Sequence, residues 1–296
     1  MSTDVSAEPM GPVVEPARRT RREVIYRHTL PVRVTHWVNA VVIFLMIGTG
    51  LNIFNAHPRL YWGQKGDAYD LAVLSIHPAS VQGATRGITQ LGSWRIDTTG
   101  VLGWSQSHGS WMARAWPGWI TIPSFQDLAD SRHWHFFLAW TLIANGAVYL
   151  AWSLWIRHVQ RDLWPTWRDL KSIPRSIWEH LRNKHPTGEE AKRYNVLQKL
   201  AYLGLISLVL GMVGTGLTLS PGLDAFAPWL LDVFGGRQSA RTLHFAFAAA
   251  IALFIFVHVA EVFLAGPINE IRSIITGAYH VPPDRPPTPR LHGGRG

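Results

Sequence analysis

The 296-residue sequence contains no cysteine. This absence excludes disulfides, cysteine-ligated iron–sulfur clusters, zinc–thiolate sites and haem attached through thioether bonds. A redox centre in this chain is therefore expected to be held by histidine, methionine or oxygen ligands.

Charged residues are scarce, at 16% of the chain, although the formal net charge is +9. A basic chain can bind nucleic acid, but no basic face alternating with stacking aromatic residues occurs here, so nucleic acid is not expected as a partner. The basic residues flank long apolar blocks instead, which is typical of a membrane protein whose positive loops lie inside.

Four apolar blocks are long enough to cross a bilayer as helices, surrounded by membrane lipid. They cover about residues 35–54, 133–156, 197–219 and 240–266. A cluster of arginines between Arg18 and Arg22 precedes the first block. This cluster predicts a cytoplasmic N-terminus, and four crossings then place the C-terminus in the cytoplasm as well.

The segments outside the blocks differ in composition. Residues 1–28 lack the apolar core of a secretory signal and are expected to form a basic, disordered tail, as is the proline-rich stretch 280–296. Residues 29–279 then form one membrane domain. Its connection 58–131 is expected to fold, with short helical pieces, over the outer face of the membrane that the helices cross. The basic connection 157–194 is expected to lie on the cytoplasmic face of the same membrane.

The fourth block carries two histidines, His244 and His258, fourteen residues apart. At about 100° and 1.5 Å per helical residue, this spacing returns to within roughly 40° of the same face and rises about 21 Å. Ionisable residues in membrane spans are rare and functional, and imidazole is a common axial ligand of haem iron. The spacing favours two haems; one hydrogen-bonded core histidine and one interfacial histidine is the simpler alternative.

The two halves of the sequence resemble each other. MIGTGL at residues 46–51 recurs as MVGTGL at 212–217, and RHWHF at 132–136 recurs as RTLHF at 241–245. These motifs occupy matching places in the first and third blocks and in the second and fourth. The predicted fold is an all-α integral membrane protein, a four-helix di-haem bundle of two similar helical hairpins with short surface helices.

Topology and the repeat together select the haem ligands. His244 and the start of the second block both lie near the outer face, and the repeat aligns His135 rather than His133 with His244. His258 lies near the inner face, where the first block begins with His36. The predicted metal ligands are thus two pairs, His135 with His244 and His36 with His258.

The repeat also explains why only one inner pair is expected. Tyr202 occupies the position that corresponds to His36, and Tyr149 the position that corresponds to His258. Tyrosine is a poor ligand for a low-spin haem, so this second inner position is not expected to hold one. Zinc or di-iron sites are disfavoured because, Glu261 excepted, the spans offer no carboxylates beside the histidines.

Small and basic residues near these positions are further candidates for cofactor binding. Glycines in the two repeated motifs either let a porphyrin approach the backbone or serve ordinary close helix packing. They are Gly48, Gly50, Gly214 and Gly216. Arg132 and Arg241, one turn before the outer histidines, either pair with haem propionates or anchor the helices at the interface.

Several segments carry a resemblance to a known family: THWVNA at 35–40, NAHPRLYWG at 55–63, RHWHFFLAW at 132–140, LSPGLDAFAPWL at 219–230, GGRQSARTLHF at 235–245 and EIRSIITG at 270–277. The chain resembles the bacterial cytochrome b561 and nickel-hydrogenase b-type cytochrome group over roughly residues 26–279. Within it, the sequence is most similar to the thiosulfate-reductase-type cytochrome b subunits of periplasmic molybdopterin oxidoreductases.

The resemblance implies a protein of the bacterial inner membrane with two b haems that exchanges electrons with the quinone pool. It implies ligands at His36, His135, His244 and His258, with His133 an extra histidine beside the expected ligand. The expected function is electron transfer between quinone and a periplasmic, molybdopterin-type oxidoreductase subunit. Two alternatives stay open: a transporter or proton relay that uses the membrane histidines, and a haem-containing anchor without quinone turnover.

Overall fold

The structure, a computed structural model, describes residues 23–67, 70–107, 109–157, 161, 163–182 and 195–281. Four long helices dominate it: α1 (Leu30–Ala56), α2 (Leu128–Trp155), α5 (Val196–Leu219) and α8 (Arg237–Ala265). All four are long and apolar enough to cross a membrane. The four predicted spans are therefore confirmed as helices.

Polar residues that precede the apolar runs set where two of these helices begin. The side chain of Asp127 accepts a hydrogen bond from the backbone N–H of Asp130 at 2.9 Å, which starts α2 earlier than its apolar run. Asn195 and Gln198 form a reciprocal capping box at the start of α5. The caps satisfy N–H groups that a helix N-terminus otherwise leaves without partners.

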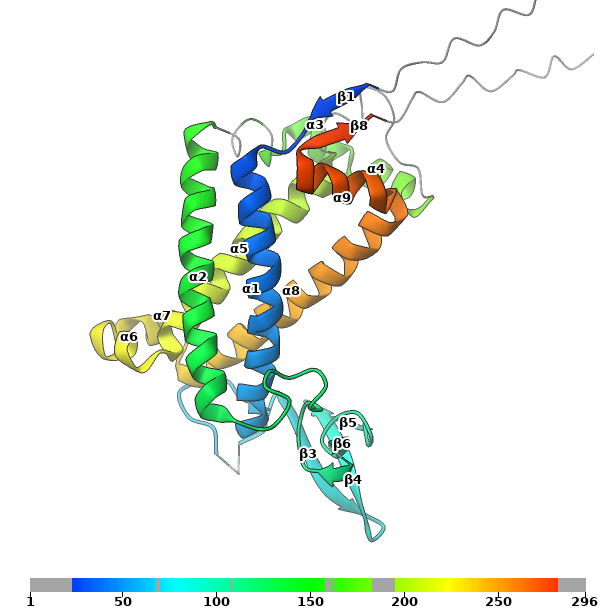
Figure 1. Ribbon diagram of the computed structural model, residues 1–296. Helices are drawn as coiled ribbons and strands as arrows, with labels where there is room; N and C mark the ends of the chain where they lie inside the picture. The colour runs from blue at the N-terminus through cyan, green and yellow to red at the C-terminus, as the bar shows by residue number, and fades with distance from the viewer. Residues whose placement is uncertain are drawn as a thin grey trace, which may run out of the picture.

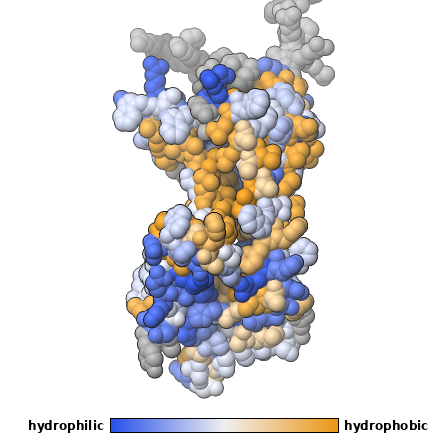
Figure 2. Space-filling view, turned by 90° about the vertical axis from the view of Figure 1, so that its left-hand side faces the viewer, coloured by the Kyte–Doolittle hydropathy of each residue, from blue (hydrophilic) through white to orange (hydrophobic). Residues whose placement is uncertain are grey.

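The long helices associate in pairs. α1 packs mainly against α2, and α5 mainly against α8; in Figure 1, α1 and α2 stand side by side while α8 runs obliquely to them. Val42 of α1 and Leu138 and Leu142 of α2 form the buried core of the first pair. Figure 2 shows a hydrophobic band across the helices, with hydrophilic residues gathered below it at the end that carries the β-strands.

The connection between α1 and α2 contains β-structure, so the prediction of short helical pieces there was wrong. An antiparallel sheet has the order β2 (Arg59–Leu60), β3 (Leu74–Val81), β4 (Ala84–Leu91) and β5 (Trp94–Asp97). A separate hairpin pairs β6 (Ser105–Ser107) with β7 (Ser110–Met112). The fold is accordingly mostly helical rather than all-α.

A tight turn explains the longest hairpin of this sheet. Val81 pairs with Ala84, so only Gln82 and Gly83 connect β3 to β4. Both have positive φ angles, 52° and 82°, as the two-residue turns that match strand twist require. A glycine at the second position makes this conformation accessible without steric cost.

The segment between β2 and β3 is attached to the first two turns of α8. Thr242 donates to the carbonyl of Tyr61 at 2.6 Å, and Ser239 accepts from the backbone N–H of Gly63 at 2.8 Å. A Cβ atom added to Gly236 would lie 2.6 Å from the carbonyl oxygen of Gly63. Glycine is therefore required at this contact, which fixes the outer end of α8 against the sheet region.

The two ends of the described chain meet at the opposite end of the helices. β1 (Val24–Tyr26) pairs antiparallel with β8 (Ala278–His280), and Figure 1 shows both strands beyond the upper ends of α1 and α2. Residues 24–26 and 280 were predicted to be disordered, so the ordered domain extends further than expected at both ends. Residues 1–22 and 282–296 of the predicted tails lie outside the described residues.

Short helices complete the described structure, as expected for the surface segments. They are α3 (Trp167–Lys171), α4 (Ile173–Leu181), α6 (Pro221–Phe226), α7 (Trp229–Val233) and α9 (Pro267–Thr276). α3 is joined to α5 by an ion pair between Asp169 and Lys199 at 2.9 Å. The hydrogen bond from Lys199 and the cap that Asp169 makes at Thr166 hold the pKa of this carboxyl below its usual range.

Candidate functional site: two facing histidine pairs

The pair predicted for the outer side of the membrane, called the outer pair below, consists of His135 of α2 and His244 of α8. Their ring centres are 6.3 Å apart and the ring planes are inclined by 68°. His133, two residues before His135, is exposed and its ring lies beside that of Trp134. Of the two histidines at the start of α2, the one that the internal repeat selected therefore faces α8.

Each outer histidine is oriented by the helix that packs against it. The Nδ1 atom of His244 lies 3.1 Å from both the hydroxyl of Thr215 and the carbonyl oxygen of Met212. A carbonyl oxygen only accepts hydrogen bonds, so this contact assigns the proton to Nδ1 and leaves the lone pair on Nε2. Neutral imidazole with a free Nε2 is a metal-binding tautomer, held by its other nitrogen.

The same arrangement recurs around His135, as the repeat requires. Its Nδ1 lies 3.0 Å from the hydroxyl of Thr49, and the imidazole also forms a hydrogen bond with the backbone of Met46. Thr49 and Thr215 occupy equivalent places in the repeated GTG motifs, and both hydroxyls donate to carbonyls of their own helix. The sequence reasoning missed these threonines, although the repeat of the motif was the available signal.

Two of the candidate glycines make room for the outer imidazoles. A Cβ atom on Gly50 would lie 3.3 Å from Cε1 of His135, and one on Gly216 would lie 3.1 Å from Cε1 of His244. Contacts this short force the ring or the helix to move. These glycines therefore permit a helix backbone to approach the histidine rings.

The other two candidate glycines have different neighbours. A Cβ atom on Gly48 would lie 2.7 Å from Cγ1 of Ile122, and one on Gly214 would lie 3.2 Å from the ring of Phe234. Gly48 thus lets the loop before α2 pack on α1. Gly214 lets the ring that precedes α8 pack on α5.

The inner pair consists of His36 of α1 and His258 of α8. Their ring centres are 6.4 Å apart, with the planes inclined by 65°. His258 is stacked on Phe254, one turn earlier on α8, with ring centres 5.9 Å apart and an interplanar angle of 2°. Nδ1 of His36 is buried and has no hydrogen-bond partner among the described residues.

The separation within both pairs fits coordination of one metal between them. An imidazole nitrogen binds a metal at about 2.0 Å, and its ring centre lies about 1.1 Å behind it, so two opposed imidazoles place their ring centres roughly 6.2 Å apart, close to both observed separations. The described residues contain no group of three or more histidine and acidic side chains arranged so that they could hold a metal ion together. Paired imidazoles without further ligands suit the two axial positions of haem iron better than a four-ligand zinc site.

The candidate arginines have contacts within the protein. Arg241 donates to the backbone carbonyl of His57, and its guanidinium lies 6.0 Å from the ring centre of Phe54. Arg132 is exposed and lies over the ring of Phe136 at 5.8 Å. Both arginines are one turn from the outer pair, as their spacing predicts.

A loop of residues 113–126 closes over the outer end of α1 and was not recognised from the sequence. Buried Asn52 donates to the carbonyls of Pro123 and Phe125 at 3.1 and 2.9 Å, and Ile122 donates to the carbonyl of Gly48 at 3.1 Å. Arg114, 2% exposed, donates to Ser124 and Thr121. Burial lowers the pKa of its guanidinium below the usual range.

Asn55 provides a direct test of this attachment. Its Oδ1 accepts from the backbone N–H of Trp116 at 2.7 Å, and its Nδ2 donates to the carbonyl of the same residue at 3.3 Å. Asn55→Leu should cost about 1–3 kcal/mol, because the N–H of Trp116 loses its acceptor. Hydrogen exchange of residues 113–126 should accelerate, whereas Gln126→Leu, which removes an exposed amide, should leave it unchanged; equal exchange in both variants would contradict the assignment.

Four apolar helices define an integral, multi-pass membrane protein, and the facing imidazole pairs define a site suited to haem. The family model described as prokaryotic cytochrome b561 matches residues 27–277, so the chain belongs to the prokaryotic cytochrome b561 family. It is accordingly a membrane electron-transfer protein with b-type haem.

One similar protein aligns with most of this chain, and the alignment also covers most of that protein. It is the "Putative protein-methionine-sulfoxide reductase subunit YedZ1" of Azospira oryzae, 25% identical over 243 residues, which cover 82% of this chain and 93% of the relative.

Proposed function

We propose that this protein is a di-haem cytochrome b that carries electrons across the bacterial inner membrane between the quinone pool and an oxidoreductase subunit on the outer side. The proposal rests on one observation. α8 carries one histidine toward each of its ends, and each of these histidines faces a second histidine on a neighbouring helix. His244 and His258 are fourteen residues apart, which corresponds to about 21 Å along a helix. Two redox centres at this spacing bridge most of a hydrocarbon core about 30 Å thick.

In this proposal four histidines would hold two b haems. His135 and His244 would hold the outer one, and His36 and His258 the inner one. When bound, the haem iron supplies one-electron chemistry. Thr49 and Thr215 keep the proton on Nδ1 of the outer histidines, so that Nε2 faces the metal position.

The pseudo-symmetry supports one inner haem rather than two. Tyr149 and Tyr202, which correspond to His258 and His36, are half-buried on α2 and α5. Of the two equivalent inner positions, only the one between α1 and α8 offers an imidazole pair. The repeat relates the two halves of the protein by an approximate two-fold axis. This axis passes between His135 and His244, because these two residues correspond to each other in the repeat.

We assign both termini and the inner pair to the cytoplasmic side. The β1–β8 end of the molecule adjoins the basic connection that includes Arg168, Lys171, Arg175 and Arg182, and basic loops favour the cytoplasm. Quinone reaches the inner pair from the bilayer.

Arg132 and Arg241 stay candidates for partners of the haem propionates. The four glycines, Gly48, Gly50, Gly214 and Gly216, stay candidates for residues that shape the haem positions.

The connection between α1 and α2, residues 58–131, is the proposed docking surface for a periplasmic partner. Large apolar side chains project from it, including Trp94 and Trp119, which are 75% and 78% exposed. The partner is proposed to be a molybdopterin-type oxidoreductase. The name of the Azospira relative favours a catalytic subunit that reduces protein-bound methionine sulfoxide.

Such a partner would set the direction of electron flow. Oxidation of a quinol releases two electrons and two protons, and reduction of a sulfoxide to methionine consumes two electrons and two protons and forms water. Electrons would then travel from the inner pair to the outer pair. The protein contributes ligands and a low-dielectric path, while the substrate chemistry belongs to the partner.

Quinol-dependent reduction tests this function. Membranes that contain the protein should develop reduced b-type absorption bands when a quinol is added, and reoxidation should require the outer partner with its substrate. A haem protein without quinone turnover would instead be reduced by dithionite but not by quinol. That result would contradict the relay and favour a membrane anchor.

A further inference from the structure

Helix α9 begins directly after the last membrane helix. α8 ends at Ala265, and Gly266, with φ at 110°, turns the chain before Pro267 starts α9. Figure 1 places α9 at the end of α8 that lies away from the β2–β5 sheet. α9 therefore lies where the hydrocarbon core of the membrane gives way to the headgroup region.

One face of α9 is apolar and uncovered. Ile268, Ile271 and Ile275 are 81%, 44% and 52% exposed, and their spacing places them along one side of the helix. The opposite side is fixed to the protein, because Ser273 is 1% exposed and Asn269 donates to the carbonyl of His280 at 2.9 Å. The exposed face is thus held in one orientation by the folded domain.

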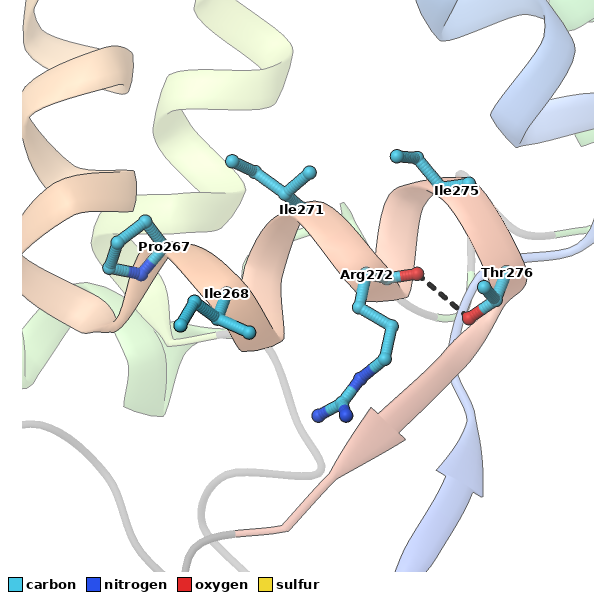
Figure 3. A pocket seen from close by; sticks show the side chains of 6 residues that line it. All are labelled: Pro267, Ile268, Ile271, Arg272, Ile275 and Thr276. Atoms are coloured by element: carbon cyan, nitrogen blue, oxygen red, sulfur yellow. Dashed lines mark hydrogen bonds between the residues drawn. The ribbon is translucent and has the colours of Figure 1, made fainter.

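A groove of about 430 Å³ follows this face. It is lined by Pro267, Ile268, Ile271, Arg272, Ile275 and Thr276. Figure 3 shows Ile271 and Ile275 extending from one edge of the helix and Arg272 extending from the other edge, on the same side as Ile268. An apolar surface thus lies next to a single cationic group.

The guanidinium of Arg272 is only partly engaged within the protein. Its Nη2 donates to Oδ1 of Asn269 at 3.0 Å, and no ion pair of Arg272 occurs among the described residues. The neighbouring carboxylate, Glu270, forms an ion pair with Arg27 at 3.9 Å. The terminal Nη groups of Arg272 can therefore donate a charge-assisted bond to an anionic oxygen.

We propose that the α9 groove binds an anionic phospholipid of the adjoining leaflet. The phosphate group contacts Arg272 and the acyl chain lies along Ile268, Ile271 and Ile275. A soluble phosphate would account for the arginine but leave the isoleucines exposed to water. A phospholipid satisfies both features at the depth where α9 lies.

Native mass spectrometry of the full-length protein in detergent tests the site, with phosphatidylglycerol and phosphatidylcholine as probes. Arg272→Gln should weaken phosphatidylglycerol binding about fivefold, the loss expected for one cationic contact to an anionic lipid. Binding of phosphatidylcholine should change little. Arg175→Gln removes an exposed arginine of α4 that pairs with Glu179, and this control should bind both lipids as the unaltered protein does.

Further measurements separate the lipid from other occupants. Ile271→Ser should weaken both lipids, because it removes acyl-chain contact. Thermal melting by circular dichroism checks that each variant is folded. Equal loss in Arg272→Gln and Arg175→Gln, or displacement of the lipid by inorganic phosphate, would overturn the proposal. These readouts do not depend on electron transfer, so the outcome is independent of the proposed relay.

Discussion

The His36→Ala variant is expected to retain one haem b and lose quinol-dependent reduction, whereas His135→Ala should keep the inner haem and lose transfer to the outer partner. Each substitution removes one imidazole of one facing pair and leaves the other pair intact. The b-type absorbance per chain should therefore fall by about half in either variant, because a bis-histidine site needs both ligands.

The chain offers a matched control for this experiment. His133 is exposed and two residues from His135, so His133→Ala changes the same residue type at the same end of α2. It should retain both haems and quinol-dependent reduction. If His133→Ala lost a haem and His135→Ala did not, the assignment of the outer ligand would be wrong.

The Gly216→Ala variant is expected to impair the outer haem although it removes no ligand. The added Cβ would lie 3.1 Å from Cε1 of His244, so the ring has to shift by a few tenths of an ångström relative to Thr215, the residue that orients it. Loss of a group that orients a metal ligand typically weakens metal binding about 10–100-fold. We expect haem affinity to fall by at least about tenfold at the outer position, with the inner haem retained.

Another glycine on the same helix separates this effect from ordinary helix packing. A Cβ on Gly204 would meet no atom within 4 Å. Gly204→Ala should therefore leave haem content unchanged and slightly stabilise α5, because alanine favours helix more than glycine. Haem titration and the reduction potential of each haem measure the difference. Equal haem affinity in the two variants would show that the approach of Gly216 to His244 has no functional effect.

The membrane helices could be predicted because their signal is one of composition over a long stretch. Four apolar blocks and the repeated GTG and histidine motifs sufficed for four spans and for the choice of His135 over His133. The structure places the two histidines of each predicted pair opposite each other, with ring centres 6.3 and 6.4 Å apart, while ligation of haem stays a prediction. The shared face of His244 and His258 could be predicted from the helical period alone, because residues fourteen apart lie on nearly the same face of any α-helix.

The outer connection could not be predicted because its order depends on contacts between distant residues. β3 and β4 are joined by Gln82 and Gly83, a pair that is a weaker turn signal than Asn-Gly or Asp-Gly. The attachment of the sheet region to α8 requires Gly63 and Gly236 to meet across most of the chain. No local pattern in the sequence identifies such a contact.

The glycines show a similar limit at the candidate site. Their small size indicated a close approach, but the sequence did not say which group would approach. The structure distinguishes Gly50 and Gly216, which face imidazoles, from Gly48 and Gly214, which face Ile122 and Phe234. Only the tertiary arrangement separates a glycine that serves a ligand from one that serves packing.

The haem content of the purified, unaltered protein tests the central claim most directly. Two facing imidazole pairs predict two haem b groups per chain, measured as the pyridine haemochrome against protein concentration from amino-acid analysis. A ratio of two is the expected result. A ratio of one in fully reconstituted protein would contradict the two-haem relay and leave one of the histidine pairs without the role assigned to it.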